Sequence, residues 1–263
     1  MGSVRTSILG RPRRLSRDRR ANRRYTLNCD EPVKNAARLE RLLAGDCDVL
    51  VLTETHDALA LPVPYVAVSS DQRPTAAAGG RWVTIWSRLP VRQLATKDPV
   101  RTAAAEVAGG MVVYGTVLPW HTDPGPMPDP AAPLPNWSEF MRVTSLQGAV
   151  WRALREENPG SVFIVAGDLN QSLGAKHYYG TTAGRQLLRD SLKQADLTCF
   201  TDDEHLPQGL LQHPPIDHIC AAAPVGHVLE RVDWVGWEGT WEGAGRLSDH
   251  SAVAVTLRSV PGV

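Results

Sequence analysis

The sequence of 263 residues lacks any apolar run close to the ~20 residues that a membrane-spanning helix needs. Its N-terminal stretch carries charge but no apolar segment of the kind found in a secretory signal. It also shows no internal repeat and no second domain boundary. These absences exclude a membrane span, and they leave enough chain for one large α/β domain with a sizeable core.

Cysteine is scarce and scattered. The chain has four cysteines and no CxxC pair: Cys29, Cys47, Cys199 and Cys220. In a chain of this size, such spacing predicts reduced thiols and a cytoplasmic protein rather than a disulfide framework or a zinc site.

The formal net charge is zero, but the charge is unevenly distributed. Residues 1–24 hold nine arginines and one aspartate, whereas the rest of the chain holds 19 Lys and Arg against 27 Asp and Glu. Blocks of like charge are usually unfolded, so we expect residues 1–24 to be a basic, disordered tail and residues 25–259 to form a single domain. The alternative is an electrostatic arm for nucleic acid or another polyanion.

Apolar patterns place many strands and few helices along the chain. Strands are predicted at about residues 25–29, 48–54, 63–68, 81–87, 91–94, 111–118, 162–166, 216–221, 226–235 and 251–257. Helical spacing predicts three helices, at about 32–44, 136–154 and 183–195, the second with a capping box of Asn136 and Glu139. Seven prolines from Pro119 to Pro135 exclude regular structure in that loop. The expected class is therefore α/β.

The stretch VFIVAGDLNQSL, residues 162–173, ends a buried strand with a carboxylate and a carboxamide. Asp168 and Asn170 would share one face if the strand stays extended that far. The competing interpretation is turn chemistry, because Gly, Asp and Asn are common turn residues.

Polar residues follow or precede other predicted strands in the same way. They are Asn28, Asp30, Glu54, Asp217, Asp249 and His250. Each alone has a simple structural explanation as a turn or a solvated strand end. Together with Asp168 they predict a ligand or metal site, because such sites gather at strand ends.

These segments resemble the endonuclease/exonuclease/phosphatase superfamily of metal-dependent phosphoesterases. The matching pieces, in chain order, are TLNCD (26–30), VLVLTET (49–55), GGRWVTIWSRLPV (79–91), VAGDLNQS (165–172), IDHI (216–219) and LSDHSAV (247–253). The resemblance implies a four-layer α/β sandwich, in which two packed sheets lie between helices and the site lies where their strand ends meet.

The resemblance also implies a divalent cation. Glu54 would be its main ligand, Asn28 and Asp30 would lie beside it, and Asp249 would complete the metal or water network. Oxygen ligands alone favour Mg²⁺ or Mn²⁺ over zinc.

The remaining implied roles concern water and phosphate. Asp168 would orient or deprotonate the attacking water, and Asn170 would donate its amide to a phosphate oxygen. His250 would act as imidazolium donor or as base, and Asp217 would fix its tautomer. The choice of base between His250 and Asp168 stays open.

Some positions depart from the family pattern or lie at the expected rim. His121, with Trp120 as the alternative, is the nearest candidate for a phosphate contact after the strand 111–118. The substrate candidates are Arg246, Trp241 and one of Tyr178 or Tyr179, whose alternative role is loop packing.

The expected function is cation-dependent hydrolysis of a phosphodiester in DNA or RNA. A phosphatase or phosphodiesterase for a small or lipid phosphate is the alternative within the enzyme class. A binding module on the same fold would be expected to lose several of the site residues that this chain retains. The oligomeric state is left open.

Overall fold

The structure is a computed structural model that describes most of the chain. It describes residues 4–9, 40, 43–44, 46–74, 78–126, 129, 131–175, 177–202, 211–237, 240–241, 245–246, 248 and 250–262, without the side chains of 4–9, 240–241 and 245–246. Its first seven strands are β1 (Val4–Leu9), β2 (Val49–Thr53), β3 (Val66–Ser69), β4 (Val83–Ser87), β5 (Val91–Leu94), β6 (Thr102–Val107) and β7 (Met111–Val117). There follow α2 (Ser138–Glu157), β8 (Val162–Asp168), α3 (Thr182–Gln194), β9 (Thr198–Cys199), β10 (Asp217–Ala222), β11 (His227–Trp237), β12 (Thr240–Trp241), β13 (Gly245–Arg246) and β14 (Ala252–Pro261).

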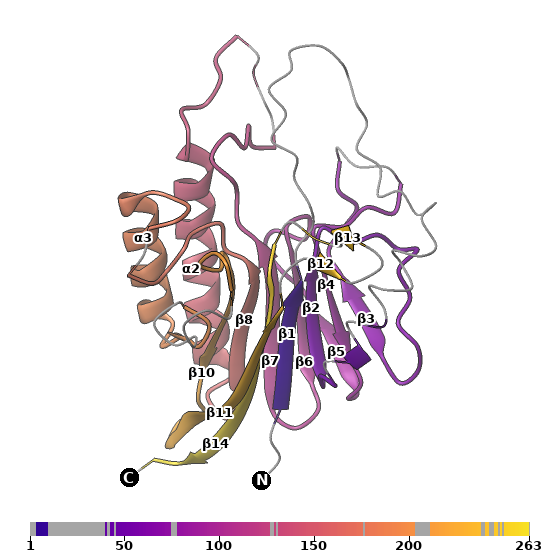
Figure 1. Cartoon of the computed structure of the whole chain (residues 1–263). Coiled ribbons are helices and arrows are strands. Elements are labelled where there is room, and N and C mark those ends of the chain that lie inside the picture. The colour runs from indigo at the N-terminus through magenta and orange to yellow at the C-terminus, as the bar shows by residue number, and fades with distance from the viewer. Residues whose placement is uncertain are drawn as a thin grey trace.

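Two six-stranded sheets form the centre of the molecule (Figure 1). The first sheet has the order β11-β14-β1-β2-β4-β3, and the second has the order β5-β6-β7-β8-β10-β9. In each sheet one pair of neighbours is parallel, β1 with β2 and β7 with β8, and the other described pairs are antiparallel. The expected α/β class is confirmed.

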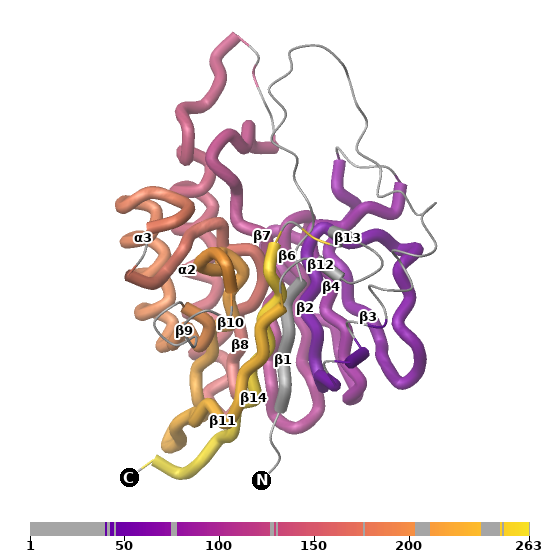
Figure 2. The backbone as a smooth tube through the Cα atoms, viewed as in Figure 1, coloured from indigo at the N-terminus to yellow at the C-terminus, as the bar shows by residue number. Residues whose placement is uncertain are grey.

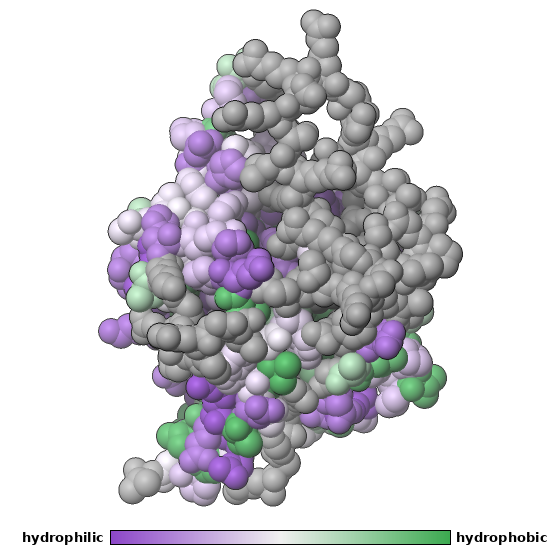
Figure 3. Space-filling model, in the orientation of Figure 1, coloured by the Kyte–Doolittle hydropathy of each residue, from purple (hydrophilic) through white to green (hydrophobic). Residues whose placement is uncertain are grey.

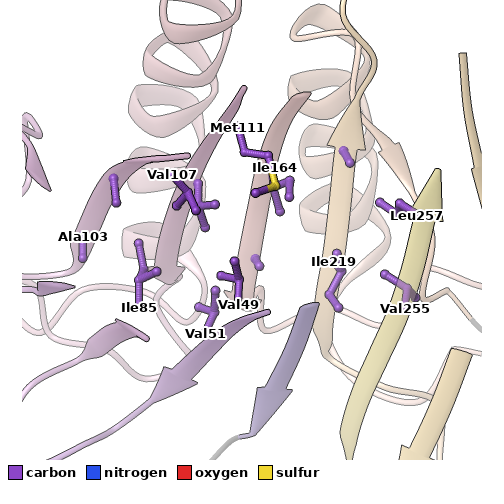
Figure 4. Packing of buried hydrophobic residues seen from close by; sticks show 14 of the residues in the cluster. Val49, Val51, Ile85, Ala103, Val107, Met111, Ile164, Ile219, Val255 and Leu257 are labelled. Atoms are coloured by element: carbon purple, nitrogen blue, oxygen red, sulfur yellow. The ribbon is translucent and has the colours of Figure 1, made fainter. Parts of the chain in front are cut away.

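Apolar side chains from both sheets fill the space between them (Figure 4). At one position of β7 this packing requires a glycine. A Cβ on Gly115 would lie 2.8 Å from Cγ2 of Val83 and 3.2 Å from Cγ1 of Val51. A larger residue would push the two sheets apart, because protein cores are packed too densely to absorb the added volume.

Helices α2 and α3 cover the outer face of the second sheet (Figure 1). Phe140 and Trp151 of α2 and Leu188 of α3 are fully buried there. The outer face of the first sheet is covered by a smaller cluster around Leu50 and Trp86. The four-layer expectation fits only roughly, because most of the helix expected at 32–44 lies outside the described residues; within it, Glu40, Leu43 and Ala44 are helical.

The N-terminal segment corrects one expectation. The tail predicted for residues 1–24 is wrong for Val4–Leu9, which form β1 and pair with β14 on one side and β2 on the other. The residues Val4, Thr6 and Ile8 are β-branched, which suits an inner strand. The strand expected at 25–29 lies outside the described residues.

Helix α2 begins later than its predicted capping box. Trp137 occupies the N-cap in a left-handed conformation, with no side-chain capping bond. Glu139 is buried, and its carboxylate accepts hydrogen bonds of 2.6 and 2.8 Å from Arg142. The capping box of Asn136 and Glu139 is therefore wrong, because Arg142 binds the carboxylate that would have turned back to the helix start.

The C-terminal strand β14 runs beside β11 along most of its length (Figure 2). Where β11 begins and β14 ends, Val225 and Val228 are exposed. Apolar residues are visible on that part of the surface (Figure 3). Among the described residues, no helix has both the length and the apolar composition for crossing a membrane.

Candidate active site

Asp168 and Asp217 are placed opposite each other by two paired strands. Asp168 is the last residue of β8, Asp217 is the first of β10, and the two are direct partners in the antiparallel ladder. The strand continues through Gly167 rather than turning there, with a φ of 138°. A Cβ on Gly167 would lie 1.9 Å from the carbonyl oxygen of Thr116, so the strand can bring Asp168 to this place only with a glycine.

Asn170 meets Asp168 through a turn and not through strand alternation. Asn170 has a positive φ of 51°, and its backbone N–H donates to Oδ1 of Asp168 at 2.9 Å. Its side-chain Nδ2 donates to Oδ2 of Asp168 at 3.0 Å and to the carbonyl of Leu118 at 2.7 Å. The turn interpretation of this stretch is therefore confirmed, and strand extension as far as Asn170 is wrong; the turn itself buries a carboxylate and a carboxamide side by side.

His250 joins the two sheets at this point. It lies just before β14 of the first sheet, and its Nδ1 is 2.7 Å from Oδ2 of Asp217 in the second sheet. Asp217 is 1% exposed and His250 is 18% exposed at the side chain. A buried carboxylate bonded to Nδ1 fixes the orientation and the tautomer of the ring, which fits a group that transfers protons at its other nitrogen.

The surroundings of Asp168 disfavour the charged form of its carboxyl group. Burial and the neighbouring Asp217 carboxylate raise the pKa of Asp168 to about 7, although His250 and the Asn170 backbone act in the opposite direction. Oδ1 of Asp217 is buried and has no hydrogen-bond partner among the described residues. The carboxyl groups of Asp168 and Asp217 therefore have too little positive charge around them. A bound cation or a proton would relieve the repulsion between them.

Glu54 lies across from this pair, just beyond the end of β2. It has a positive φ of 53°, and its backbone N–H donates to the carbonyl of Trp82 at 2.7 Å. Its Oε2 is 3.3 Å from Nη1 of Arg73. The Glu54 charge contributes to the raised pKa of Asp168, so the two carboxylates act on each other.

The described residues include one compact set of metal-ligating atoms. Asp168, Asp217 and His250 each offer one such atom within 4.8 Å of the others. The carboxylate oxygens and the lack of positive charge fit a hard divalent cation such as Mg²⁺ or Mn²⁺. Nδ1 of His250 already contacts Asp217, so a cation held through that nitrogen would replace the His250–Asp217 contact.

In the segment after β7, the neighbouring residues Trp120 and His121 pack against different tryptophans. Trp120 lies against Trp82, with ring centroids 5.7 Å apart. His121 lies 6.1 Å from the Trp137 ring, and its Nδ1 is buried with no hydrogen-bond partner among the described residues. The role of either residue in phosphate binding stays a prediction.

Of the two tyrosines considered for substrate contact, only one is well exposed. Tyr178 is 53% exposed and stacks on the His213 ring at 4.5 Å. Tyr179 is half-buried and packs edge-on against Trp137 at 5.5 Å. Tyr178 is thus the better rim candidate, and Tyr179 packs the loop.

Other predicted site residues have no described side chain. Trp241 and Arg246 lie on the paired strands β12 and β13, of which the structure describes the backbone. Asn28, Asp30 and Asp249 lie outside the described residues.

Two features of the site were not among the predicted site residues. Arg73 stacks on Trp82 beside Glu54, but nothing in the loop sequence separates it from the many other arginines. Buried His218 holds the loop after Asn170 through a 2.9 Å contact between its Nε2 and the carbonyl of Gln171. Burial opposes its charge, but neighbouring Cys199 raises the pKa of His218 to about 9.

Comparisons with known proteins agree with this geometry. The profile of the Endonuclease/Exonuclease/phosphatase family matches residues 25–250. The search of curated proteins gave no match.

Solved structures show the same fold at low identity. A 3'-5' exonuclease (NExo) from Neisseria meningitidis has a TM-score of 0.61 and 17% identity, covering 95% of this chain and 98% of that chain. An AP endonuclease from Archaeoglobus fulgidus has a TM-score of 0.60 and 14% identity, covering 99% and 100%. D. rerio TDP2 complexed with single-strand DNA product has a TM-score of 0.59 and 15% identity, covering 98% and 100%.

Proposed function

Because the chain belongs to the Endonuclease/Exonuclease/phosphatase family, we propose that it hydrolyses phosphodiesters of nucleic acid with a divalent cation. The observation that carries this proposal is the 2.7 Å contact between His250 and Asp217, directly beside the buried Asp168. A histidine held by one carboxylate and next to a second carboxylate of raised pKa has the parts needed for proton transfer to and from water.

Asp168 receives or orients the attacking water in this proposal. Its pKa of about 7 is close to that of an effective base at neutral pH. Asn170 holds the Asp168 carboxylate in place with two hydrogen bonds. Its amide also donates to Leu118, so Asn170 would need to exchange a bond in order to bind a phosphate oxygen.

His250 serves the phosphate or the leaving oxygen. Asp217 bonds Nδ1 of His250, so the proton that the reaction uses is exchanged at Nε2. In this assignment the His250–Asp217 pair stays intact and does not hold the cation. The cation would then be held by Glu54.

Glu54 would hold the cation, with Asn28, Asp30 and Asp249 as the further ligands that we propose. Bound there, Mg²⁺ or Mn²⁺ would neutralise charge on the phosphate group and lower the pKa of bound water. Glu54 is accessible enough for this role, since its side chain is 14% exposed.

Nucleic acid is the substrate class that the comparisons favour. The similar structures are those of an exonuclease, an AP endonuclease and TDP2 with a single-strand DNA product. The exposed Tyr178 ring offers a surface on which an unpaired base could stack.

The test compares bis-p-nitrophenyl phosphate, p-nitrophenyl phosphate and a labelled oligonucleotide, each with Mg²⁺, Mn²⁺ or EDTA. We expect cation-dependent cleavage of the diester and the oligonucleotide, which His250→Ala abolishes. His227→Ala is the matched control, because His227 lies at the start of β11, paired with Pro261 at the far end of β14. Cleavage of the monoester alone would replace the nuclease proposal with a phosphatase, and activity that persists in EDTA would overturn the cation's role.

A further inference from the structure

Arg73 is a largely buried cation next to Glu54. It lies in the loop between β3 and β4, with its Nη1 3.3 Å from Oε2 of Glu54. Its guanidinium carbon lies 3.8 Å from the centroid of the Trp82 ring. The Arg73 side chain is 20% exposed and Trp82 is 4% exposed, so the stacked pair is mostly shielded from water. Shielding strengthens both the stacking and any charge contact that Arg73 makes.

The hydrogen-bonding capacity of Arg73 is not used up. A guanidinium group has five N–H donors, and Nε of Arg73 is buried with no acceptor among the described residues. Its contact with Glu54 is long and involves one nitrogen. Nearby Arg81 shows the contrast, because its Nε and Nη2 bind both oxygens of Asp57 at 2.9 and 2.7 Å. Arg81 thus uses its donors in an ion pair with Asp57, whereas Arg73 retains an N–H donor that has no acceptor among the described residues.

The backbone fixes the position of Arg73 before any ligand arrives. Its N–H donates to the carbonyl of Gly80 at 2.9 Å, and the N–H of Trp82 donates to Oγ of Ser70 at 3.2 Å. The N–H of Glu54 in turn donates to the carbonyl of Trp82 at 2.7 Å. These bonds join the segments that carry Arg73, Trp82 and Glu54, and the stacking on Trp82 limits the side-chain freedom that Arg73 would lose on binding.

We propose that Arg73 is a phosphate-binding residue, held by Trp82 so that its free N–H edge takes a non-bridging oxygen of the substrate's phosphate group. This inference rests on the proposed function, since it assumes that the phosphate comes to the Glu54 side of the site. Planar N–H pairs match phosphate oxygens, and a charged, shielded pair of this kind binds more tightly than a neutral one.

The position of Arg73 between Glu54 and a phosphate has an unusual consequence. Without phosphate, Arg73 and a divalent cation would compete for the Glu54 carboxylate, because both are positive and Arg73 already contacts its Oε2. With phosphate present, both positive groups attract the same anion. Removal of Arg73 should therefore strengthen cation binding in the free protein and weaken phosphate binding, which are effects of opposite sign.

The experiment measures both affinities by calorimetry in wild type, Arg73→Ala and Arg73→Lys. For Arg73→Ala we expect a Kd for Mn²⁺ that falls by about 3-fold, as for one partly exposed charge contact. The Kd for inorganic phosphate, measured with Mn²⁺ present, should rise by about 10-fold or more. Arg73→Lys keeps the charge but loses the planar edge, so its Mn²⁺ affinity should match wild type while its phosphate affinity stays reduced.

Arg258→Ala is the control for loss of one positive charge, because Arg258 forms an exposed ion pair with Glu230 on the β11–β14 pair. It should change neither affinity. If Arg73→Ala weakens Mn²⁺ and phosphate together, or leaves phosphate binding unchanged, the inference is overturned and Arg73 only supports the loop.

Failure of the proposed function gives a different pattern. In that case wild type shows no cation-dependent cleavage, and Glu54→Gln does not alter Mn²⁺ binding. Phosphate binding by calorimetry still decides the role of Arg73: a weaker affinity in Arg73→Ala supports it, and an equal affinity overturns it.

Discussion

The two sides of the candidate site are built on different principles. On the side of the second sheet, Asp168, Asn170 and Asp217 are buried; Asn170 donates two hydrogen bonds to Asp168, and Asp217 contacts His250. On the side of the first sheet, Glu54 and Arg73 are joined by a single 3.3 Å contact and are partly exposed. The first arrangement suits groups whose geometry must be held fixed for proton transfer, and the second suits groups that exchange partners when ligands bind.

Their charges differ in the same way. The second-sheet side carries two carboxylates with one histidine, and burial together with the Asp217 charge raises the pKa of Asp168. The first-sheet side balances Glu54 with Arg73. A chemical step should therefore depend most on the second-sheet side, and binding of cation and phosphate should depend most on the first-sheet side.

The largest expected effect comes from breaking the His250–Asp217 pair. His250→Ala should lower kcat by about 10³-fold, since it removes the group that exchanges the proton. Asp217→Asn should lower kcat by about 10²-fold, because the ring keeps its place but loses its charged partner. Steady-state kinetics on bis-p-nitrophenyl phosphate measures both. Equal kcat in Asp217→Asn and wild type would show that the 2.7 Å contact has no part in catalysis.

Glu54→Gln tests the first-sheet side. We expect the Mn²⁺ concentration for half-maximal activity to rise by about 10-fold or more, with a smaller change in kcat at saturating Mn²⁺. Asp168→Asn should give the reverse pattern, a large fall in kcat with a smaller shift in the Mn²⁺ requirement. If Asp168→Asn instead has the larger effect on Mn²⁺, the cation is held by the Asp168, Asp217 and His250 set.

Asp168 also links the site to stability. Its pKa is about 7 in the folded protein, above the ordinary value of 3.8, so the folded state holds this proton more tightly than the unfolded state does. The stability that results is present below the ordinary pKa and is lost as pH rises through about 7. Asp168→Asn removes this pH-dependent loss. The difference in Tm between variant and wild type should therefore change by about 3 °C in favour of the variant between about pH 5 and about pH 8.

Differential scanning fluorimetry in EDTA measures this difference, and Asp190→Asn on the exposed face of α3 is the control. A Tm difference that stays the same at both pH values would mean that Asp168 does not titrate in this range.

Much of the fold could be predicted because its strands are strongly apolar. The strands at β2, β4, β7 and β8 are almost entirely buried, and each lies close to its predicted range. Strand β6 was not predicted, because its sequence TAAAEV is rich in alanine, which is a weak strand former. Strand β1 was obscured by the arginine-rich stretch that follows it, since charge patterning describes a segment as a whole and not six residues within it.

The site was predictable in part for a related reason. Asp168, Asn170, Asp217 and His250 each stand at a strand end, and the structure brings them together. Arg73 was not predictable, because its role depends on stacking against Trp82, which belongs to the next strand region and is reached only after folding. Sequence patterns locate residues along strands, but they do not give the pairing of loops across a sheet edge.

The smallest expected effect concerns the rim of the second-sheet side. Tyr178→Ala removes an exposed ring that stacks on His213, and it leaves the Asp168 and His250 contacts unchanged. If an unpaired base stacks there, KM for a single-stranded oligonucleotide should rise by about 5-fold, while KM for bis-p-nitrophenyl phosphate stays the same. Tyr178→Phe keeps the ring and should behave as wild type. A parallel rise in both KM values would mean that Tyr178 supports the loop and does not contact the substrate. The rim of the second-sheet side would then have no part in substrate binding at this position.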